Sequence, residues 1–133
     1  MSENLDLVGS ICAAWASGDF SSVEWADPEI EYVVADGVQP GRWKGVTGMV
    51  ERWREGLDAF EDNRVEADDY RELDDERVLV LLHRSGRGKI SGLELGQVEN
   101  QGAGLFHIRH GRVIRYVVYF ARDRALADLG LKE

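Results

Sequence analysis

The sequence predicts an α+β fold, in which helices gather on one face of a curved, mainly antiparallel sheet. Two segments in the first half carry apolar residues at helical spacing, and a β-favouring stretch lies between them. From residue 64 onward the pattern becomes that of strands separated by turns. The predicted order is helix, short helix, strand, helix, four or five antiparallel strands and a terminal helix, with residues 1–133 as one domain.

Residues 2–17 are predicted to form the first helix. Its apolar stripe recurs at three- and four-residue steps and consists of Leu5, Val8, Ile11, Cys12 and Trp15. Ser2 can cap the start, and Gly18 suits the left-handed position that follows the end. Residues 19–28 are predicted as a short second helix or a turn, because the Asp-Pro pair at their end stops regular structure.

The first strand is predicted over residues 29–35, and a long helix follows the next loop. The helical stripe runs through Val46, Met49, Val50, Trp53, Leu57 and Phe60. Residues 64–88 are predicted as two strands around the turn 73–77, and residues 89–120 as two or three more, with a hairpin at His110-Gly111. A terminal helix is expected over residues 122–129, ended by Gly130.

The strands "VLVLL" (78–82) and "VIRYVVYF" (113–120) are apolar at both parities. We therefore expect both faces to be covered, one by helices and the other by a second subunit in a homodimer. The glycine-rich residues 85–96 lack the spacing of a phosphate-binding loop and are predicted to form a bent hairpin.

The charge and composition exclude several classes of partner. A net charge of -9 disfavours binding to nucleic acid or to an anionic membrane and suits a small, uncharged or mildly cationic molecule. Cys12 is the single cysteine, so no intramolecular disulfide or zinc–cysteine cluster is predicted. The N-terminal segment lacks the pattern of a signal peptide and no apolar run reaches the length of a membrane span, so we expect a cytoplasmic protein.

Several local features together resemble the nuclear transport factor 2-like superfamily, in its SnoaL-like branch, which is related to ketosteroid isomerase and polyketide cyclases. They are "WASGDF" (15–20), "ADPEIEYVV" (26–34), "GRWKGVTGMVERW" (41–53) and the closing hairpin, strand and helix of residues 107–131. The resemblance covers nearly the whole chain. It implies a cone-shaped curved antiparallel or mixed sheet, wrapped around helices and enclosing one mostly apolar pocket; it does not by itself imply an activity.

The related isomerases use an Asp general base near the end of the first strand, a Tyr from the first helix and a protonated Asp in the sheet. Aligned on the loop after the strand, the base is Asp36; aligned on the start of the strand, it is Tyr32 or Val33. The helix Tyr corresponds to Ile11, and the sheet acid falls near Gly104. Because both oxyanion donors are missing, the steroid mechanism is not expected.

Asp36 is the first catalytic candidate. In an unbroken strand it shares a parity with Tyr32 and Val34, and a carboxylate among apolar groups is a plausible base near neutral pH. Against this, Asp-Gly is a favoured turn dipeptide, and Val33 and Ala35 are also apolar, so the inward parity stays open.

His83 is the second catalytic candidate, since it lies within an apolar strand and is the histidine most expected to face a cavity. The alternative is a hydrogen-bonded or exposed histidine. His107 and His110 have no ligand spacing, and no metal or cofactor is predicted.

Aromatic side chains supply the predicted ligand contacts. The candidates for ligand binding are Trp15, Tyr32, Trp43, Trp53, Phe106 and Tyr119. The alternative is simple core packing, which is also the interpretation of Trp25. Tyr116 has the parity opposite to Tyr119 and is expected to face elsewhere.

Two functional hypotheses follow. The first is a cofactor-independent isomerase, cyclase or lyase that acts on a small apolar carbonyl compound, with Asp36 moving the proton and His83 or Tyr119 assisting. The second is a non-catalytic module for ligand binding or dimerisation.

Overall fold

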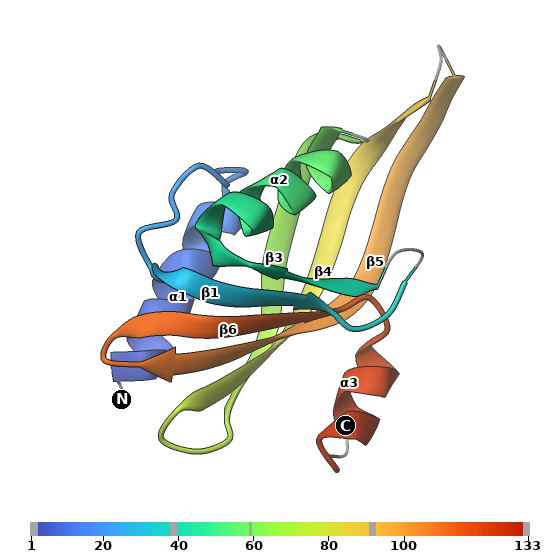
Figure 1. Cartoon of the computed structure of the whole chain (residues 1–133). Helices are drawn as coiled ribbons and strands as arrows, with labels where there is room; N and C mark the ends of the chain where they lie inside the picture. The colour runs from blue at the N-terminus through green and yellow to red at the C-terminus, as the bar shows by residue number, and fades with distance from the viewer. Residues whose placement is uncertain (1–2, 38–39, 59, 91–92, 132–133) are drawn as a thin grey trace.

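One mixed, curved sheet carries the helices on both of its sides (Figure 1). The computed structural model describes residues 3–37, 40–58, 60–90 and 93–131, and the elements below are those of these residues. The helices are α1 (Glu3–Ala16), α2 (Gly45–Asp58) and α3 (Arg122–Asp128). The strands are β1 (Ala26–Val34), β2 (Gly41–Lys44), β3 (Phe60–Glu72), β4 (Arg77–Ile90), β5 (Leu93–Arg109) and β6 (Arg112–Tyr119).

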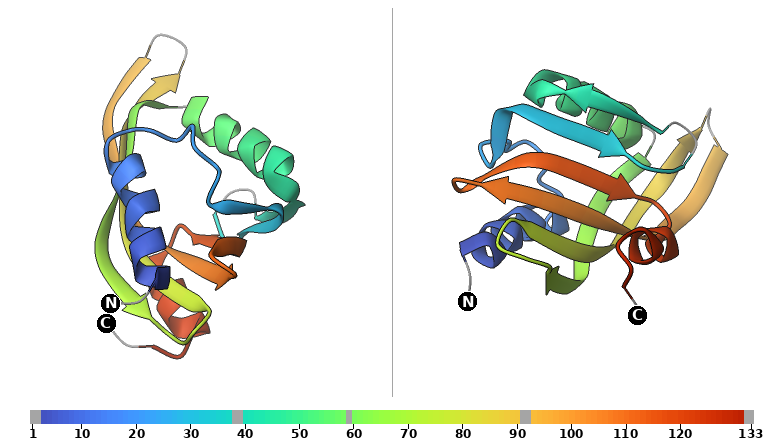
Figure 2. Two further views of the ribbon diagram at one scale, coloured as in Figure 1. Left: turned by 90° about the vertical axis from the view of Figure 1, so that its left-hand side faces the viewer. Right: turned by 60° about the horizontal axis from the view of Figure 1, so that its bottom comes forward.

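The strand order is β2-β1-β6-β5-β4-β3, with β1 parallel to β6 and every other pair antiparallel. The sheet bends around α1 and α2 without closing into a barrel, as the side view in Figure 2 shows. This confirms the predicted α+β class and the cone-like form that the resemblance implied. Among the described helices, none is long and apolar enough to cross a membrane.

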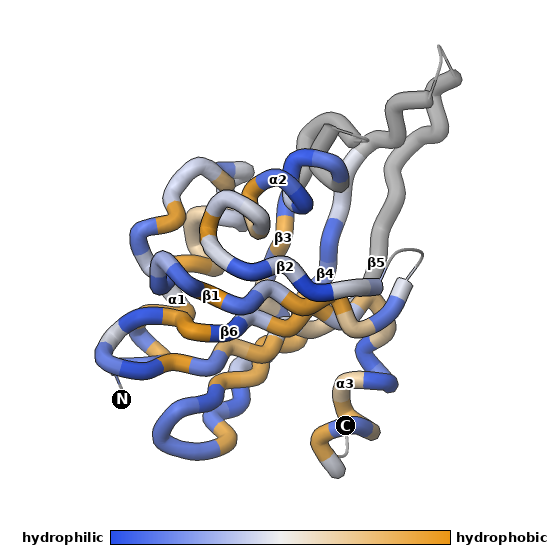
Figure 3. The backbone as a smooth tube through the Cα atoms, viewed as in Figure 1, coloured by the Kyte–Doolittle hydropathy of each residue, from blue (hydrophilic) through white to orange (hydrophobic). Residues whose placement is uncertain are grey.

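The apolar residues of the sheet form two separate cores, one on each face. On β4, Val78, Val80 and Leu82 lie on the concave face and pack with α1 and α2. Leu79 and Leu81 alternate with them and lie on the convex face, where α3 packs. The apolar stretches of β4 and β6 are visible in Figure 3. Both faces of these strands are covered, as predicted, but the prediction that the helices gather on one face is wrong, because α3 packs on the convex face where a second subunit was expected.

The first helix ends as the sequence predicts. Gly18 has a φ of 86°, the left-handed conformation that costs glycine little, and its N–H donates to the carbonyl of Trp15 at 3.0 Å. Of the two alternatives predicted after it, a short helix or a turn, the structure shows the turn. Residues 19–25 form turns in which Asp19 accepts a hydrogen bond from the backbone N–H of Ser21 at 3.0 Å.

The first strand begins earlier than predicted, at Ala26. Its pairing with β6 is interrupted between Ala26 and Glu31, and Pro28, which has no N–H to donate, lies in that interruption. The four-residue strand β2 was not predicted; it pairs Trp43 with Tyr32 of β1. The long helix ends at Asp58, so the prediction that it reaches Phe60 is wrong, because Phe60 opens β3.

Two predicted turns are confirmed. Asp74 closes the β3–β4 turn, since its carboxylate accepts hydrogen bonds from the backbone N–H groups of Glu76 and Arg77 at 2.9 and 2.8 Å. His110 and Gly111 both have positive φ, as a tight hairpin turn between β5 and β6 requires. The tip of the predicted glycine-rich hairpin, residues 91–92, lies outside the described residues.

Candidate functional site: the aromatic interior of the cone

Aromatic rings from six elements meet on the concave face. Trp15 of α1 lies at the centre, with its ring centroid 5.8 Å from Trp53 of α2, 6.1 Å from Phe106 of β5 and 5.7 Å from Tyr116 of β6. Tyr32 of β1 continues the cluster, with its ring 5.8 Å from Tyr116 and 6.0 Å from Trp43 of β2. The structure therefore brings together five of the six predicted ligand-binding residues from segments far apart in the sequence: Trp15, Tyr32, Trp43, Trp53 and Phe106.

The accessible part of this cluster consists of half-buried residues that we call the aromatic mouth: Trp43, Trp53, Phe120, Arg52 and Arg84. The Cζ atom of Arg52 lies 5.4 Å from the ring centroid of Trp43, and that of Arg84 lies 4.8 Å from the ring centroid of Phe120. A guanidinium over an aromatic face is attracted by the ring quadrupole and keeps its N–H groups available. The mouth thus combines flat apolar walls with two cations.

Tyr116 fills the place that the sequence alignment left empty. A Cβ atom at residue 104 would lie 2.8 Å from Cε1 of Tyr116 and 3.0 Å from its hydroxyl oxygen, so only glycine leaves room for this ring. Burial raises the pKa of Tyr116 above its ordinary value, and the neighbouring Arg84 offsets only part of that effect. Tyr116 therefore keeps its proton and supplies a hydroxyl beside Arg84, near the position of the missing sheet acid.

The pKa of Tyr32 is influenced by both arginines of the mouth. Burial raises the pKa of its phenol, whereas Arg84, a hydrogen bond with Trp53 and Arg52 each act to lower it. The two arginines come from different elements, α2 and β4, yet both act on this one hydroxyl. Two positive charges therefore act on the interior of a protein whose net charge is -9.

Asp36 lies beside Phe120 of the mouth, and both of its carboxylate oxygens accept hydrogen bonds from the backbone. Oδ1 accepts a hydrogen bond from the backbone N–H of Phe120 at 2.6 Å, and Oδ2 accepts one from that of Ala121 at 3.1 Å. Gly37 follows with a φ of 92°, as the turn interpretation predicts. Asp36 therefore ties the loop after β1 to the end of β6, next to the ring on which Arg84 rests.

His83 lies on the convex face, and the expectation that it faces the cavity is wrong. Its neighbours Leu82 and Arg84 take the concave parity. The Nδ1 atom of His83 is 2.7 Å from Oδ1 of Asp68, and Oδ2 of Asp68 accepts a hydrogen bond from Arg122 at 2.6 Å. Arg122 also donates to the carbonyl of Leu82 at 2.9 Å, so the group anchors the start of α3 to the sheet.

The two tyrosines of β6 have the predicted opposite parity but the reverse placement. Tyr116 lies in the interior, whereas Tyr119 packs on the convex face with the second core. Because "VIRYVVYF" is apolar at both parities, its pattern does not indicate which parity faces inward. The prediction also missed Arg52 and Arg84; the parity of Val80 and Leu82 indicates Arg84 once the inward face is known.

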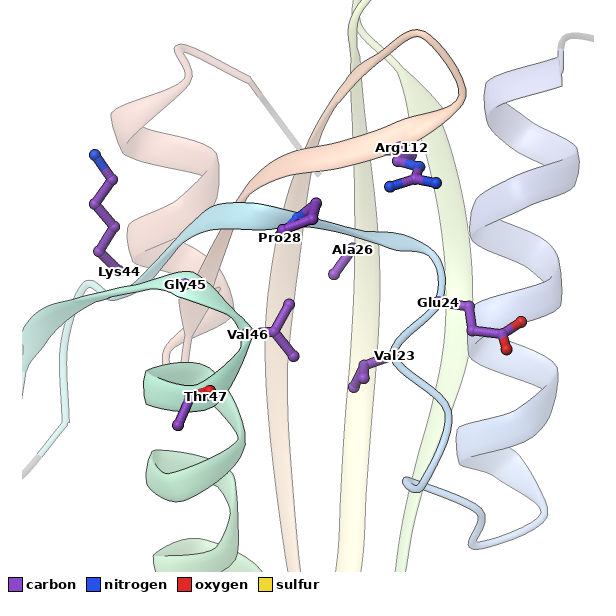
Figure 4. Close-up of a pocket in the computed structure, with 9 residues that line it drawn as sticks. All are labelled: Val23, Glu24, Ala26, Pro28, Lys44, Gly45, Val46, Thr47 and Arg112. Atoms are coloured by element: carbon purple, nitrogen blue, oxygen red, sulfur yellow. The ribbon is translucent and has the colours of Figure 1, made fainter.

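A further cleft of about 850 Å³ opens where α2 begins, and no predicted site residue lines it (Figure 4). Val23, Ala26 and Val46 line its interior, and Glu24 and Arg112 lie at its margin. Among the described residues, no group of three His, Cys, Asp or Glu side chains is arranged to hold a metal ion.

The sequence of the chain matches one family model, the SnoaL-like domain, over residues 8–116. The chain belongs to the SnoaL-like domain family. This confirms the resemblance to the nuclear transport factor 2-like superfamily. No curated protein sequence matches the chain significantly.

Solved structures of low sequence identity share the fold over nearly their whole length. AclR from Streptomyces galilaeus is 21% identical with a TM-score of 0.73, and the match covers 98% of this chain and 97% of that one. A protein from Jannaschia sp. CCS1, assigned to the SnoaL-like polyketide cyclases, is 12% identical with a TM-score of 0.74, covering 98% and 94%. A ketosteroid isomerase-like protein from Catenulispora acidiphila, in complex with trimethylamine, is 15% identical with a TM-score of 0.70, covering 96% and 94%. At these identities the likeness shows the fold alone.

Proposed function

We propose that the chain binds a small, flat, conjugated molecule at the aromatic mouth, with a carbonyl or enol oxygen directed at Arg84. The observation that carries this proposal is the meeting of half-buried rings with Arg84, behind which lies the buried hydroxyl of Tyr116. Aromatic walls with a few convergent polar groups are typical of small-molecule sites. Membership of the SnoaL-like family supports a protein of this kind.

The catalytic form of the proposal is a cofactor-independent isomerase, cyclase or lyase. In it, the guanidinium of Arg84 stabilises the negative charge that develops on the carbonyl oxygen when a neighbouring carbon loses a proton. Asp36 is the proposed base, since it contacts the same residue, Phe120, on which Arg84 rests. Both of its oxygens already accept backbone hydrogens, so proton transfer requires that at least one of these bonds opens.

Binding of a neutral probe, 2-acetylnaphthalene, tests the proposal by isothermal titration calorimetry. We expect saturable binding that weakens about tenfold in Trp43→Leu, because the variant removes one aromatic wall of the mouth. Tyr119→Leu is the matched control, since it removes a ring from the convex face and should leave the affinity unchanged. Absence of binding to the wild type, or equal losses in both variants, contradicts the proposal.

A test for turnover follows once a bound carbonyl compound is known. Exchange of its α-hydrogens for deuterium, followed by NMR, is expected in the wild type and is expected to stop in Asp36→Asn. Continued exchange in that variant contradicts the role of Asp36 and leaves the non-catalytic alternative, a ligand-binding module.

For the convex face we propose a second copy of the chain as partner. A groove of about 360 Å³ runs there between Val33, Leu105, Val117 and Tyr119, beside the face that α3 covers. Its apolar floor is the expected feature of strands that are covered on both sides. Light scattering after size exclusion should give the mass of two chains, and the mass of one chain over a wide concentration range contradicts a dimer.

A further inference from the structure

The two arginines of the aromatic mouth lack the carboxylate partners that the protein provides elsewhere. The arginines that hold a carboxylate oxygen at 2.6–3.3 Å are Arg71, Arg77, Arg109, Arg115 and Arg122. Among the described residues, Arg84 has no ion pair, although the sequence contains 25 acidic residues against 16 basic ones. Its recorded neighbours are the ring of Phe120 and the hydroxyls of the interior tyrosines.

Arg52, the second arginine of the mouth, also lacks a close carboxylate partner. Its one carboxylate neighbour, Glu55, lies 3.9 Å away, and the side chain of that residue is 68% exposed. An ion pair of this kind contributes little. The Nε atom of Arg52 is buried and has no hydrogen-bond partner among the described residues, while the side chain as a whole is only 15% exposed.

A partly buried guanidinium group with no close counter-charge is unfavourable in the free protein, because burial removes water from it. An oxyanion bound at the mouth offsets this cost. Guanidinium groups suit planar carboxylates and enolates, which accept two parallel hydrogen bonds. The rings of Trp43 and Trp53 on the same mouth suit a flat ligand body.

We propose that Arg52 and Arg84 together select a flat aromatic ligand that carries a negatively charged oxygen, a carboxylate or an enolate. This inference rests on the proposed function, since it names the charge class of the ligand of the same mouth. It differs from the expectation drawn from the net charge, which favoured a neutral or cationic molecule. The net charge of the chain is -9, but Arg52 and Arg84 place two positive charges against the aromatic rings of the mouth.

Calorimetry with three probes at neutral pH and low salt tests the charge preference. We expect 2-naphthoate to bind at least about tenfold more tightly than 2-naphthamide, its neutral analogue, and tetramethylammonium to show no binding. Equal affinities of naphthoate and naphthamide overturn the inference and leave the proposed function standing. Binding of tetramethylammonium in preference to naphthoate also overturns it. If neither naphthyl compound binds, both proposals fail.

Three variants locate the effect. Arg84→Gln and Arg52→Gln are each expected to lose at least about tenfold in affinity for 2-naphthoate while changing that for 2-naphthamide little. Arg54→Gln, an exposed arginine of the same helix α2, removes the same charge and should change neither.

The melting temperature separates loss of binding from loss of folding. Without ligand, Arg84→Gln should melt close to the wild-type temperature, because removal of an uncompensated charge offsets the loss of the contacts with Phe120 and Tyr116. Added 2-naphthoate should raise the melting temperature of the wild type and of Arg54→Gln only. A ligand-induced rise of the same size in Arg84→Gln contradicts the inference.

Discussion

The concave and convex faces of the sheet use the same strands but differ in what they leave available. On the concave face the rings of Trp15, Phe106 and Tyr116 pack together. At its margin Arg84 has no ion pair among the described residues, and the Glu55 carboxylate is 3.9 Å from Arg52. On the convex face aliphatic side chains pack under α3, and Arg122 and Asp68 satisfy one another. The comparison suggests that one face is built for stability and the other retains unsatisfied groups for a ligand.

The largest expected effect is on the concave core. Phe106 is fully buried and stacks on Tyr116 with ring centroids 4.6 Å apart. Phe106→Ala should lower the free energy of unfolding by about 3–5 kcal/mol, since it leaves a cavity in the aromatic cluster. Urea titration measures the change, and a loss below about 1 kcal/mol would mean that the cluster is not tightly packed.

A smaller loss of unfolding free energy is expected for a substitution at Gly104, where the Tyr116 ring leaves no space for a side chain. Gly104→Ala places a methyl group 2.8 Å from the ring of Tyr116, so either the ring or strand β5 must shift. We expect a loss of about 1–3 kcal/mol in unfolding free energy.

Gly9→Ala in α1 is the matched control, because nothing lies within 4 Å of the added methyl group. It should stabilise the helix by about 0.5–1 kcal/mol. A neutral result for Gly104→Ala in the same urea titrations would contradict the placement of Tyr116.

The hydrogen-bonded group of Asp68, His83 and Arg122 on the convex face predicts that stability depends on pH. Burial acts to raise the pKa of Asp68, but hydrogen bonds from Arg122 and His83 outweigh it, and the net pKa lies below the ordinary value of 3.8. A carboxyl with a depressed pKa stabilises the fold above its unfolded pKa and loses that contribution as the pH falls through the folded value. Asp68→Asn should therefore cost about 1 kcal/mol or less at neutral pH, in keeping with a partly exposed pair.

The difference between wild type and Asp68→Asn should shrink as the pH falls below about 4, where the wild-type carboxyl becomes protonated. Thermal melts between neutral pH and pH 3 measure it. A difference that stays constant over this range would show that the ionised form of Asp68 is not what anchors α3.

The last prediction concerns the reactivity of Cys12, whose thiol is buried on the inner face of α1. Burial raises the pKa of the Cys12 thiol to about 11, with a hydrogen bond to Tyr70 opposing it. At pH 8 roughly a thousandth of the thiol is ionised, so reaction with a disulfide reagent should be slow in the native protein and fast in urea. Fast labelling of the native protein would contradict the burial of this face of α1.

The sequence predicted the helices well because their apolar stripes, such as Val8, Ile11 and Trp15, have one clear face. It failed on β2, a strand too short for a periodic signal. It also failed on the orientation of the long strands, because "VLVLL" has apolar residues at every position and both faces are buried. That ambiguity explains the reversed placement of Tyr116 and Tyr119 and the assignment of His83 to the interior.

The sequence identified Asp36 as a candidate residue but did not predict its hydrogen-bond partners. Its position at the open end of the cone follows from the strand and the turn. Its partners do not, because the backbone N–H groups of Phe120 and Ala121 are more than 80 residues away in the chain. The donors at the mouth were missed for a related reason. Tyr116 takes the space above Gly104 from a neighbouring strand, and no spacing in the sequence reports that contact.

The most direct test of the difference between the two faces is an NMR titration of the ¹⁵N-labelled protein with 2-naphthoate. The indole N–H signals of Trp43 and Trp53 are predicted to shift and saturate together. The amide signals of Leu105 and Tyr119 on the convex face should stay in place. Saturable shifts confined to the convex residues, with Trp43 and Trp53 unmoved, would contradict the account.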